Sequence, residues 1–195
     1  NMESPDFGGW GGRYVKVRDN TWLDPVPEAG YEYPEGRWYT RSAWGRMHMR
    51  DRYPDDRELM HEYFKPLARW TDAIQNDFAA RADWCVKTYQ EANHPPIVTV
   101  QGALTREVKV GERVRLVATA IDPDGDKLAG RWWQYHEADS AEGELVVKNP
   151  ASLDGASFVV PDEQGKDLHV ILEVTDDGTP PLTRYQRVVC RIVAP

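Results

Sequence analysis

Two acidic stretches hold the residues best suited to chemistry. They are Asp122-Pro123-Asp124-Gly125-Asp126 and Asp176-Asp177-Gly178. Five carboxylates brought together from loops would suit Ca²⁺, which takes roughly six to eight oxygen ligands. The alternative is conformational, because Asp, Pro and Gly are also the residues that tight turns prefer. The spacing is not that of an EF-hand loop, since no Glu stands at the twelfth position. The candidate metal ligands are Asp122, Asp124, Asp126, Asp176 and Asp177, and both interpretations stay open.

Short strands must position these turns, because the sequence after Pro96 alternates apolar and polar residues with period two. Seven or eight strands in about a hundred residues, without a helical stripe, predict an antiparallel immunoglobulin-like β-sandwich. In that order of strands the two acidic stretches are the B–C and F–G loops, which lie at the same end. The expected strand segments are 97–100, 108–110, 113–120, 130–136, 145–147, 156–160, 168–174 and 186–193.

Trp132 and Trp133 are adjacent in one predicted strand, so their side chains must face opposite sides of the sheet. One is expected in the core. The other, with Tyr135, would form an outward aromatic strip on which the apolar face of a sugar ring can stack. The alternative is that the amino-terminal half of the chain covers it.

The amino-terminal half differs in composition and predicts a separate part of the molecule. Residues 1–94 hold six of the eight Trp and seven of the nine Tyr. The boundary is expected at Asn93-His94-Pro95-Pro96, where paired prolines end a helix. We predict one helix from Asp55 to about residue 64, a break at Pro66, and a second helix over roughly 72–91. Its apolar stripe would be Ile74, Phe78, Ala82, Cys85 and Tyr89.

Aromatic and arginine side chains in the irregular segment before the helices suggest polysaccharide recognition. Loops on a rigid scaffold commonly carry binding residues, and arginines can donate hydrogen bonds to sugar hydroxyls. The alternative is that these aromatics fill an irregular core. With the pair on the predicted strand, the candidate carbohydrate-binding residues are Trp10, Arg13, Tyr14, Trp38, Tyr39, Trp44, Trp133 and Tyr135.

Composition excludes some functions and leaves others open. A net charge of −8 argues against nucleic acid as a partner, and no apolar run is long enough for a membrane span. The acidic, Trp-rich composition weakly favours a secreted protein trimmed of its signal. Cys85 and Cys190 are expected as separate buried thiols rather than a disulfide. The scattered histidines and 32 acidic residues show no catalytic constellation, so an enzyme is the less favoured hypothesis, and a structural spacer is a third.

Three segments together resemble a known family. They are Gly-Gly-Trp-Gly-Gly-Arg-Tyr at 8–14, the segment from Gln75 to Cys85, and Ala92-Asn93-His94-Pro95-Pro96. The chain resembles bacterial cellulose-binding proteins in which a nucleoside-hydrolase-like domain precedes a β-sandwich. This resemblance implies that residues 1–94 are the closing portion of the hydrolase-like domain and that 95–195 are the sandwich. The overall fold class is then α+β, and the earlier part of the hydrolase-like domain is an implied partner.

The resemblance also assigns possible roles to two neighbouring residues. Asn76-Asp77 is similar to the segment where nucleoside hydrolases place their last calcium-ligating Asp, so Asp77 is a further candidate metal ligand. Asn76 would stand beside it, where those enzymes often have an active-site residue. The Asp-rich motif that opens such domains is absent here. Asp77 can instead pair with Arg81 one helical turn later.

Overall fold

The computed structural model describes residues 15–18, 21–23 and 57–195 of the 195-residue chain. The chain forms two compact units, Asn1–Asp72 and Ala73–Pro195. In the first unit, strand β1 (Val15–Arg18) pairs antiparallel with strand β2 (Thr21–Leu23). The division expected after residue 94 from composition stays a prediction.

One continuous helix, α2 (Arg57–Trp84), replaces the two helices that the sequence predicts. It runs through Pro66, so the expected break there is wrong. A proline removes one i to i−4 hydrogen bond, and good helix formers such as Glu62, Lys65 and Leu67 surround it. The helix also ends earlier than predicted. A short 3₁₀ helix, η3 (Tyr89–Glu91), follows, and the Glu91 carboxylate accepts hydrogen bonds from the backbone N–H and the hydroxyl of Thr88.

The predicted buried stripe of the second helix is wrong. Phe78 is 70% exposed and Tyr89 is 61% exposed, and the thiol of Cys85 is exposed as well. Because α2 ends at Trp84, Cys85 and Tyr89 no longer continue its spacing. The inward face of the helix carries the buried Ala80 and the half-buried Trp84 instead. Among the described residues, no helix combines the length and apolar character that crossing a membrane requires.

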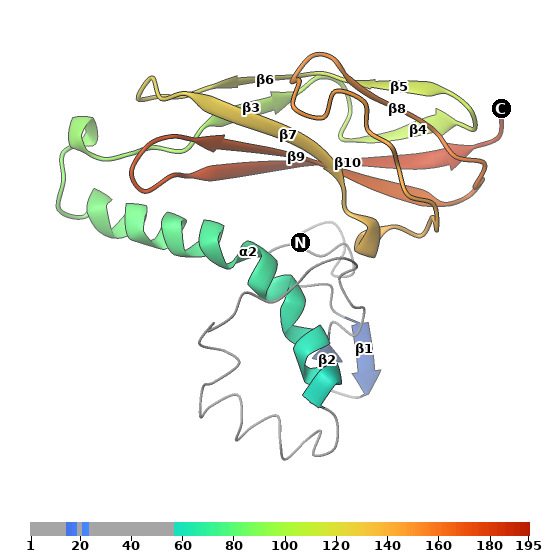
Figure 1. Cartoon of the computed structure of the whole chain (residues 1–195), viewed down its shortest axis with the longest axis horizontal. Helices are drawn as coiled ribbons and strands as arrows, with labels where there is room; N and C mark the ends of the chain where they lie inside the picture. Colours follow the sequence, from blue (N-terminus) through green and yellow to red (C-terminus); the bar gives the residue numbers. More distant parts are fainter. Residues whose placement is uncertain (1–14, 19–20, 24–56) are drawn as a thin grey trace. The chain divides into compact units, whose positions relative to one another are not determined.

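Eight strands follow Pro96 and build a β-sandwich (Figure 1). One layer is a four-stranded sheet in the order β4-β10-β9-β7, and the other consists of two ladders, β3-β6 and β5-β8. Strands β10 and β4 pair parallel, whereas the other pairs in the sandwich are antiparallel. The prediction of a wholly antiparallel sandwich is therefore wrong at this one pair. The strands are β3 (Ile97–Val100), β4 (Thr105–Lys109), β5 (Arg113–Leu116), β6 (Ala118–Ile121), β7 (Leu128–Gln134), β8 (Ala156–Val159), β9 (Asp167–Asp176) and β10 (Thr183–Val193).

Three predicted strand segments differ in detail from the structure. The long alternating segment from Arg113 to Ala120 is divided at Val117, where its first half pairs with β8 and its second half with β3. Residues 145–147 form no strand, and only a bridge between Lys148 and Ser157 lies nearby. A third predicted segment, 130–136, ends early because β7 stops at Gln134. The remaining strands overlap the segments that period-two alternation predicts.

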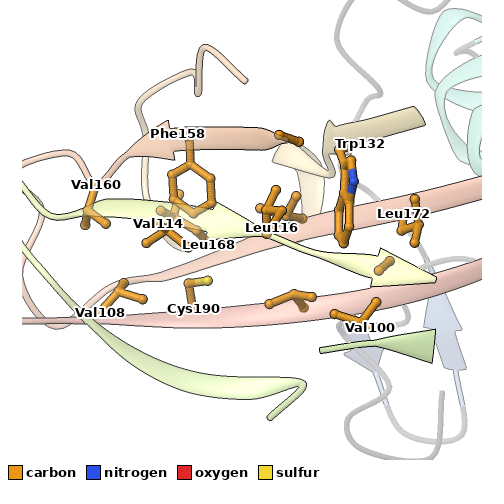
Figure 2. Close-up of a cluster of buried hydrophobic side chains, with 14 of the residues drawn as sticks. Val100, Val108, Val114, Leu116, Trp132, Phe158, Val160, Leu168, Leu172 and Cys190 are labelled. Carbon is orange, nitrogen blue, oxygen red and sulfur yellow. The ribbon is translucent and has the colours of Figure 1, made fainter. Parts of the chain in front are cut away.

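The core lies between the two layers (Figure 2). Strand β9 contributes Leu168, Val170, Leu172 and Val174, which are all fully buried, as their alternation predicts. From the other layer come side chains that include Leu116 and Phe158. Trp132 is also buried in this core, and its indole N–H donates to the carbonyl of Ser152 at 3.1 Å. This confirms the expectation that one member of the Trp pair is a core residue.

The two cysteines are free thiols, as predicted. Cys190 lies in the core between Val188 and Ile192, so its expected burial is confirmed. Burial raises the pKa of the Cys190 thiol to about 11, which keeps the sulfur protonated and unreactive at neutral pH.

Candidate functional site

The turn between β6 and β7 folds three carboxylates toward one point. One carboxylate oxygen of Asp122, Oδ1, accepts hydrogen bonds from the backbone N–H groups of Asp124 and Asp126, at 2.8 and 3.2 Å. Gly125 has a φ of 85°, a conformation that favours glycine. Carboxylate oxygens of Asp122, Asp124 and Asp126 lie within 4.8 Å of one another. The other oxygen of Asp122, Oδ2, is buried without a hydrogen-bond partner among the described residues.

The turn between β9 and β10 places a buried carboxylate beside the first turn. Asp176 is only 4% exposed. Its Oδ1 accepts from the N–H groups of Gly178 and Leu182 at 3.0 and 2.9 Å, while its Oδ2 is buried and has no partner in the described part of the chain. Asp177 binds the first turn directly, because its Oδ1 accepts from the N–H of Lys127 at 2.8 Å. Figure 1 shows both turns at one end of the sandwich, which confirms their predicted placement.

The segment that follows helix α2 completes this cluster and was missed by sequence reasoning. The amide nitrogen of Asn93 donates to Oδ1 of Asp176 at 3.1 Å and to the carbonyl of Pro180 at 2.7 Å. Asn93 is 8% exposed, and its amide oxygen is buried without a partner among the described residues. The backbone N–H of His94 donates to Asp124 at 2.6 Å. Residues 93 and 94 thus connect the two acidic turns. Their one signal in sequence is their position just before Pro95.

The carboxylates at this end of the sandwich repel one another. Partial burial and the negative charges of Asp122, Asp177, Asp176 and Asp124 raise the pKa of Asp126. The cluster therefore gathers negative charge, which hydrogen bonds from neighbouring N–H groups and the imidazole of His94 oppose.

Asp77 lies on helix α2, apart from the group of carboxylates that gather in the described residues. Its Oδ2 is 2.6 Å from Nε of Arg81, and its Oδ1 is 3.7 Å from Nη1 of Arg184. The pairing one helical turn away is therefore present, as the alternative reading expects. A metal role for Asp77 stays a prediction. In this structure its partners are the side chains of two arginines, Arg81 and Arg184.

A column of aromatic rings stands beside the acidic cluster. The rings of Tyr89 and His94 stack with centroids 3.9 Å apart, and those of His94 and Trp84 are 5.8 Å apart. The imidazole Nδ1 of His94 lies 3.1 Å from Asp124, which fixes the ring against the β6–β7 turn. Tyr89 stands at the end of the column and is 61% exposed. Sequence reasoning assigned Tyr89 to a buried stripe and so overlooked this surface ring.

The outward aromatic pair on strand β7 is only partly as predicted. Trp133 is half-buried, and its indole N–H donates to Glu173 at 3.1 Å. The guanidinium of Arg131 donates to the same carboxylate and lies 6.0 Å from the Trp133 ring centre. Tyr135 is fully buried and cannot present its ring to a ligand in this conformation. The reason is that β7 ends at Gln134, so Tyr135 leaves the alternation of the strand. The other carbohydrate-binding candidates, Trp10, Arg13, Tyr14, Trp38, Tyr39 and Trp44, lie outside the described residues.

The pKa of one further acid in the sandwich, Asp139, is shifted, and this residue has a structural role. Burial raises the pKa of Asp139 to about 7, although hydrogen bonds from Gln134 and from the backbone N–H of His169 oppose the shift. The distance from Gln134 Nε2 to Asp139 Oδ2 is 2.6 Å. These contacts hold the short 3₁₀ helix η4 (His136–Ala138) against strand β9.

Residues 113–192 match the model of the C-terminal domain of cellulose-binding protein Sde0182. The family resemblance is confirmed. A solved structure of a nucleoside hydrolase-related hypothetical protein from Saccharophagus degradans, described as associated with carbohydrate metabolism, has a TM-score of 0.67 and 30% identity. That match covers 98% of this chain, which spans 45% of the length of the relative. No curated protein matches the chain significantly.

Two other solved structures match about half of the chain at low sequence identity. A chimeric titin Z1Z2 matches 53% of this chain and 99% of its own, with 12% identity and a TM-score of 0.32. Tandem Ig repeats of Dlar match 51% of this chain and 49% of their own, with 18% identity and a TM-score of 0.30.

Proposed function

We propose that this protein is secreted and binds a cellulose-type polysaccharide. The observation that carries the proposal is the match of residues 113–192 to a domain of a cellulose-binding protein. The association of the Saccharophagus degradans relative with carbohydrate metabolism points the same way. Secretion rests on composition alone.

Two aromatic side chains in the described residues suit a sugar ring. Tyr89 offers an exposed ring that His94 supports from behind at 3.9 Å, so stacking a sugar on it requires little ordering of the protein. Trp133 is less open, but Arg131 and Glu173 stand beside it and supply a donor and an acceptor for hydroxyl groups. The six aromatic and arginine candidates of the amino-terminal half would extend the surface.

The test is retention of the chain on cellulose and retardation by soluble β-glucans in affinity electrophoresis. We expect wild type to be retained, and Tyr89→Ala and Trp133→Ala each to weaken binding by roughly tenfold, the loss of about 1.4 kcal/mol of stacking. Val146→Ser is the matched control, since Val146 is also exposed and apolar but has no ring. It lines a shallow cleft of about 250 Å³ with Arg113 and Lys148.

Each outcome assigns the function differently. If wild type is not retained on any glucan, the proposal fails and the structural-spacer hypothesis is favoured instead. If Trp133→Ala lowers the melting temperature and Tyr89→Ala has no effect on retention, the two rings have structural roles and the described surface is not the binding site. If only Val146→Ser weakens retention, the glycan binds in the cleft.

We further propose that residues 1–94 are the closing portion of a nucleoside-hydrolase-like domain. The support is the 98% coverage of this chain by a nucleoside hydrolase-related protein of which it spans 45%. The remaining part of that domain would then be a partner of this chain. The purified 195-residue chain is expected to release no ribose from nucleosides and no sugar from glycosides. Activity in the purified chain would contradict this.

A further inference from the structure

We propose that the end of the sandwich beside helix α2 binds a calcium ion, with ligands from both acidic turns and from Asn93. The carboxylates are those of Asp122, Asp124, Asp126 and Asp176, and the fifth ligand is the amide oxygen of Asn93. This site does not depend on glycan binding.

Three buried oxygen atoms carry the inference. They are Oδ2 of Asp122, Oδ2 of Asp176 and Oδ1 of Asn93, and each lacks a hydrogen-bond partner among the described residues. A buried polar atom without a partner costs about 1–3 kcal/mol when it is neutral and more when it is charged. Asp176 and Asn93 are both more than nine-tenths buried. A cation bound between the two turns would give these oxygens a partner, which a turn-forming role for the aspartates does not.

Asp176 lies at the same end of the sandwich as the β6–β7 turn, outside the group of three carboxylates that lie within 4.8 Å of one another. It pairs with Leu128 across strands β9 and β7 and belongs to the core-facing set of β9, so its side chain lies between the layers at their end. Asp126 stands two residues before Leu128, where β7 begins. The two turns are in direct contact, because the N–H of Lys127, next to Asp126, donates to Oδ1 of Asp177, next to Asp176, at 2.8 Å. The amide of Asn93 contacts Asp176 and is thereby held in the same place.

The dimensions and the ligand types favour calcium over other cations. Calcium binds oxygen at about 2.3–2.6 Å, so two ligands on opposite sides of one ion are separated by up to about 5 Å. Oxygens of Asp122, Asp124 and Asp126 lie within 4.8 Å of one another, which fits one ion between them. Four carboxylates and an amide on three chain segments form an irregular set of oxygens, which calcium accepts and magnesium, with its octahedral demand, does not. Among the described residues, the group that could hold a metal contains carboxylates alone, and a set of oxygens does not favour zinc.

Binding of the ion would hold three segments of the chain together. The segment after helix α2 would be tied through Asn93 to the turns that join β6 to β7 and β9 to β10. In the absence of the ion, the clustered negative charges oppose that arrangement. Calcium would therefore stabilise Ala73–Pro195 and order the segment that leads into β3.

The experiment is calcium titration of the EGTA-treated full chain by calorimetry, together with thermal unfolding in EGTA, calcium, magnesium and zinc. We expect one equivalent of calcium to bind, and a calcium concentration one hundred times the Kd to raise Tm by roughly 10 °C. Asp126→Asn should raise Tm in EGTA, because one repelling charge is removed, and weaken calcium binding at least tenfold. Asp162→Asn removes the same charge at an exposed position elsewhere and should leave both measurements unchanged.

Asp126 is partly exposed and is chosen so that the variant folds, whereas Asp176 is buried and its Oδ1 accepts three hydrogen bonds on which the two turns and Asn93 depend. The proposal is overturned if wild type shows no calcium-dependent heat or Tm shift. It is also overturned if Asp126→Asn and Asp162→Asn respond to calcium equally, which would indicate nonspecific attraction to the net charge of −8. A shift of the same size with magnesium would refute the choice of calcium.

Discussion

Gly178 is expected to tolerate no side chain because Asn93 lies against it. A Cβ atom at Gly178 would overlap the amide group of Asn93, and Gly178 has no left-handed φ that would by itself oppose an alanine. Gly178→Ala must therefore push the amide away from Oδ1 of Asp176 and from the carbonyl of Pro180. The first bond is to a carboxylate and contributes about 1.5–3 kcal/mol, and the second is neutral and contributes about 0.5–1.5 kcal/mol. The expected loss in unfolding free energy is about 2–4 kcal/mol.

A double-mutant cycle isolates this effect. Asn93→Ala removes the same two hydrogen bonds and the group that the new methyl would strike, so it should cost a similar 2–4 kcal/mol or so. Adding Gly178→Ala to Asn93→Ala should then change the unfolding free energy by less than about 0.5 kcal/mol. Urea denaturation in EGTA measures all four proteins without any contribution from a bound cation. If the two single effects simply add in the double variant, the contact between Asn93 and Gly178 is not the cause and the reasoning is refuted.

The other predictions concern the core, the thiols and pH. Phe158→Ala should lower the unfolding free energy by about 3–5 kcal/mol, measured by urea denaturation, because Phe158 is fully buried. With a thiol reagent, the folded chain should show one fast thiol, Cys85, and release Cys190 only on unfolding; two fast thiols would contradict the burial of Cys190. The folded chain keeps a proton on Asp139 up to about pH 7, whereas the unfolded chain loses it near pH 4. The unfolding free energy should therefore fall as pH rises from about 4 to 7, by up to about 4 kcal/mol, and Asp139→Asn should flatten that slope.

The sandwich could be predicted from the sequence because its strands obey a local rule. Leu168, Val170, Leu172 and Val174 alternate and are all buried, and the order of strands then fixes which turns share an end. The same reasoning predicts the two acidic turns of the candidate site, although it does not predict Asn93. Asp122 and Asp176 stand at turns with clear composition, so the topology alone brings their turns together.

The missed features all depend on contacts between distant segments or on where an element stops. Asn93 has partners 83 and 87 residues away, and no periodic pattern encodes such contacts. Tyr89 and Tyr135 were misplaced because α2 ends at Trp84 and β7 ends at Gln134, one or a few residues before the aromatic ring. Element boundaries are the least predictable part of a sequence, and a ring just beyond a boundary changes from buried to exposed or the reverse.

The position of β10 in its sheet has a consequence for biosynthesis. β10 separates β4 from β9 and supplies the sheet partner of β4, yet β4 emerges from the ribosome about eighty residues earlier. The backbone groups of residues 105–109 therefore cannot pair within this sheet until Val189–Val193 have been translated. Because such distant pairing is slow and leaves apolar strands uncovered meanwhile, the nascent domain is expected to be a client of chaperones until its final strand arrives.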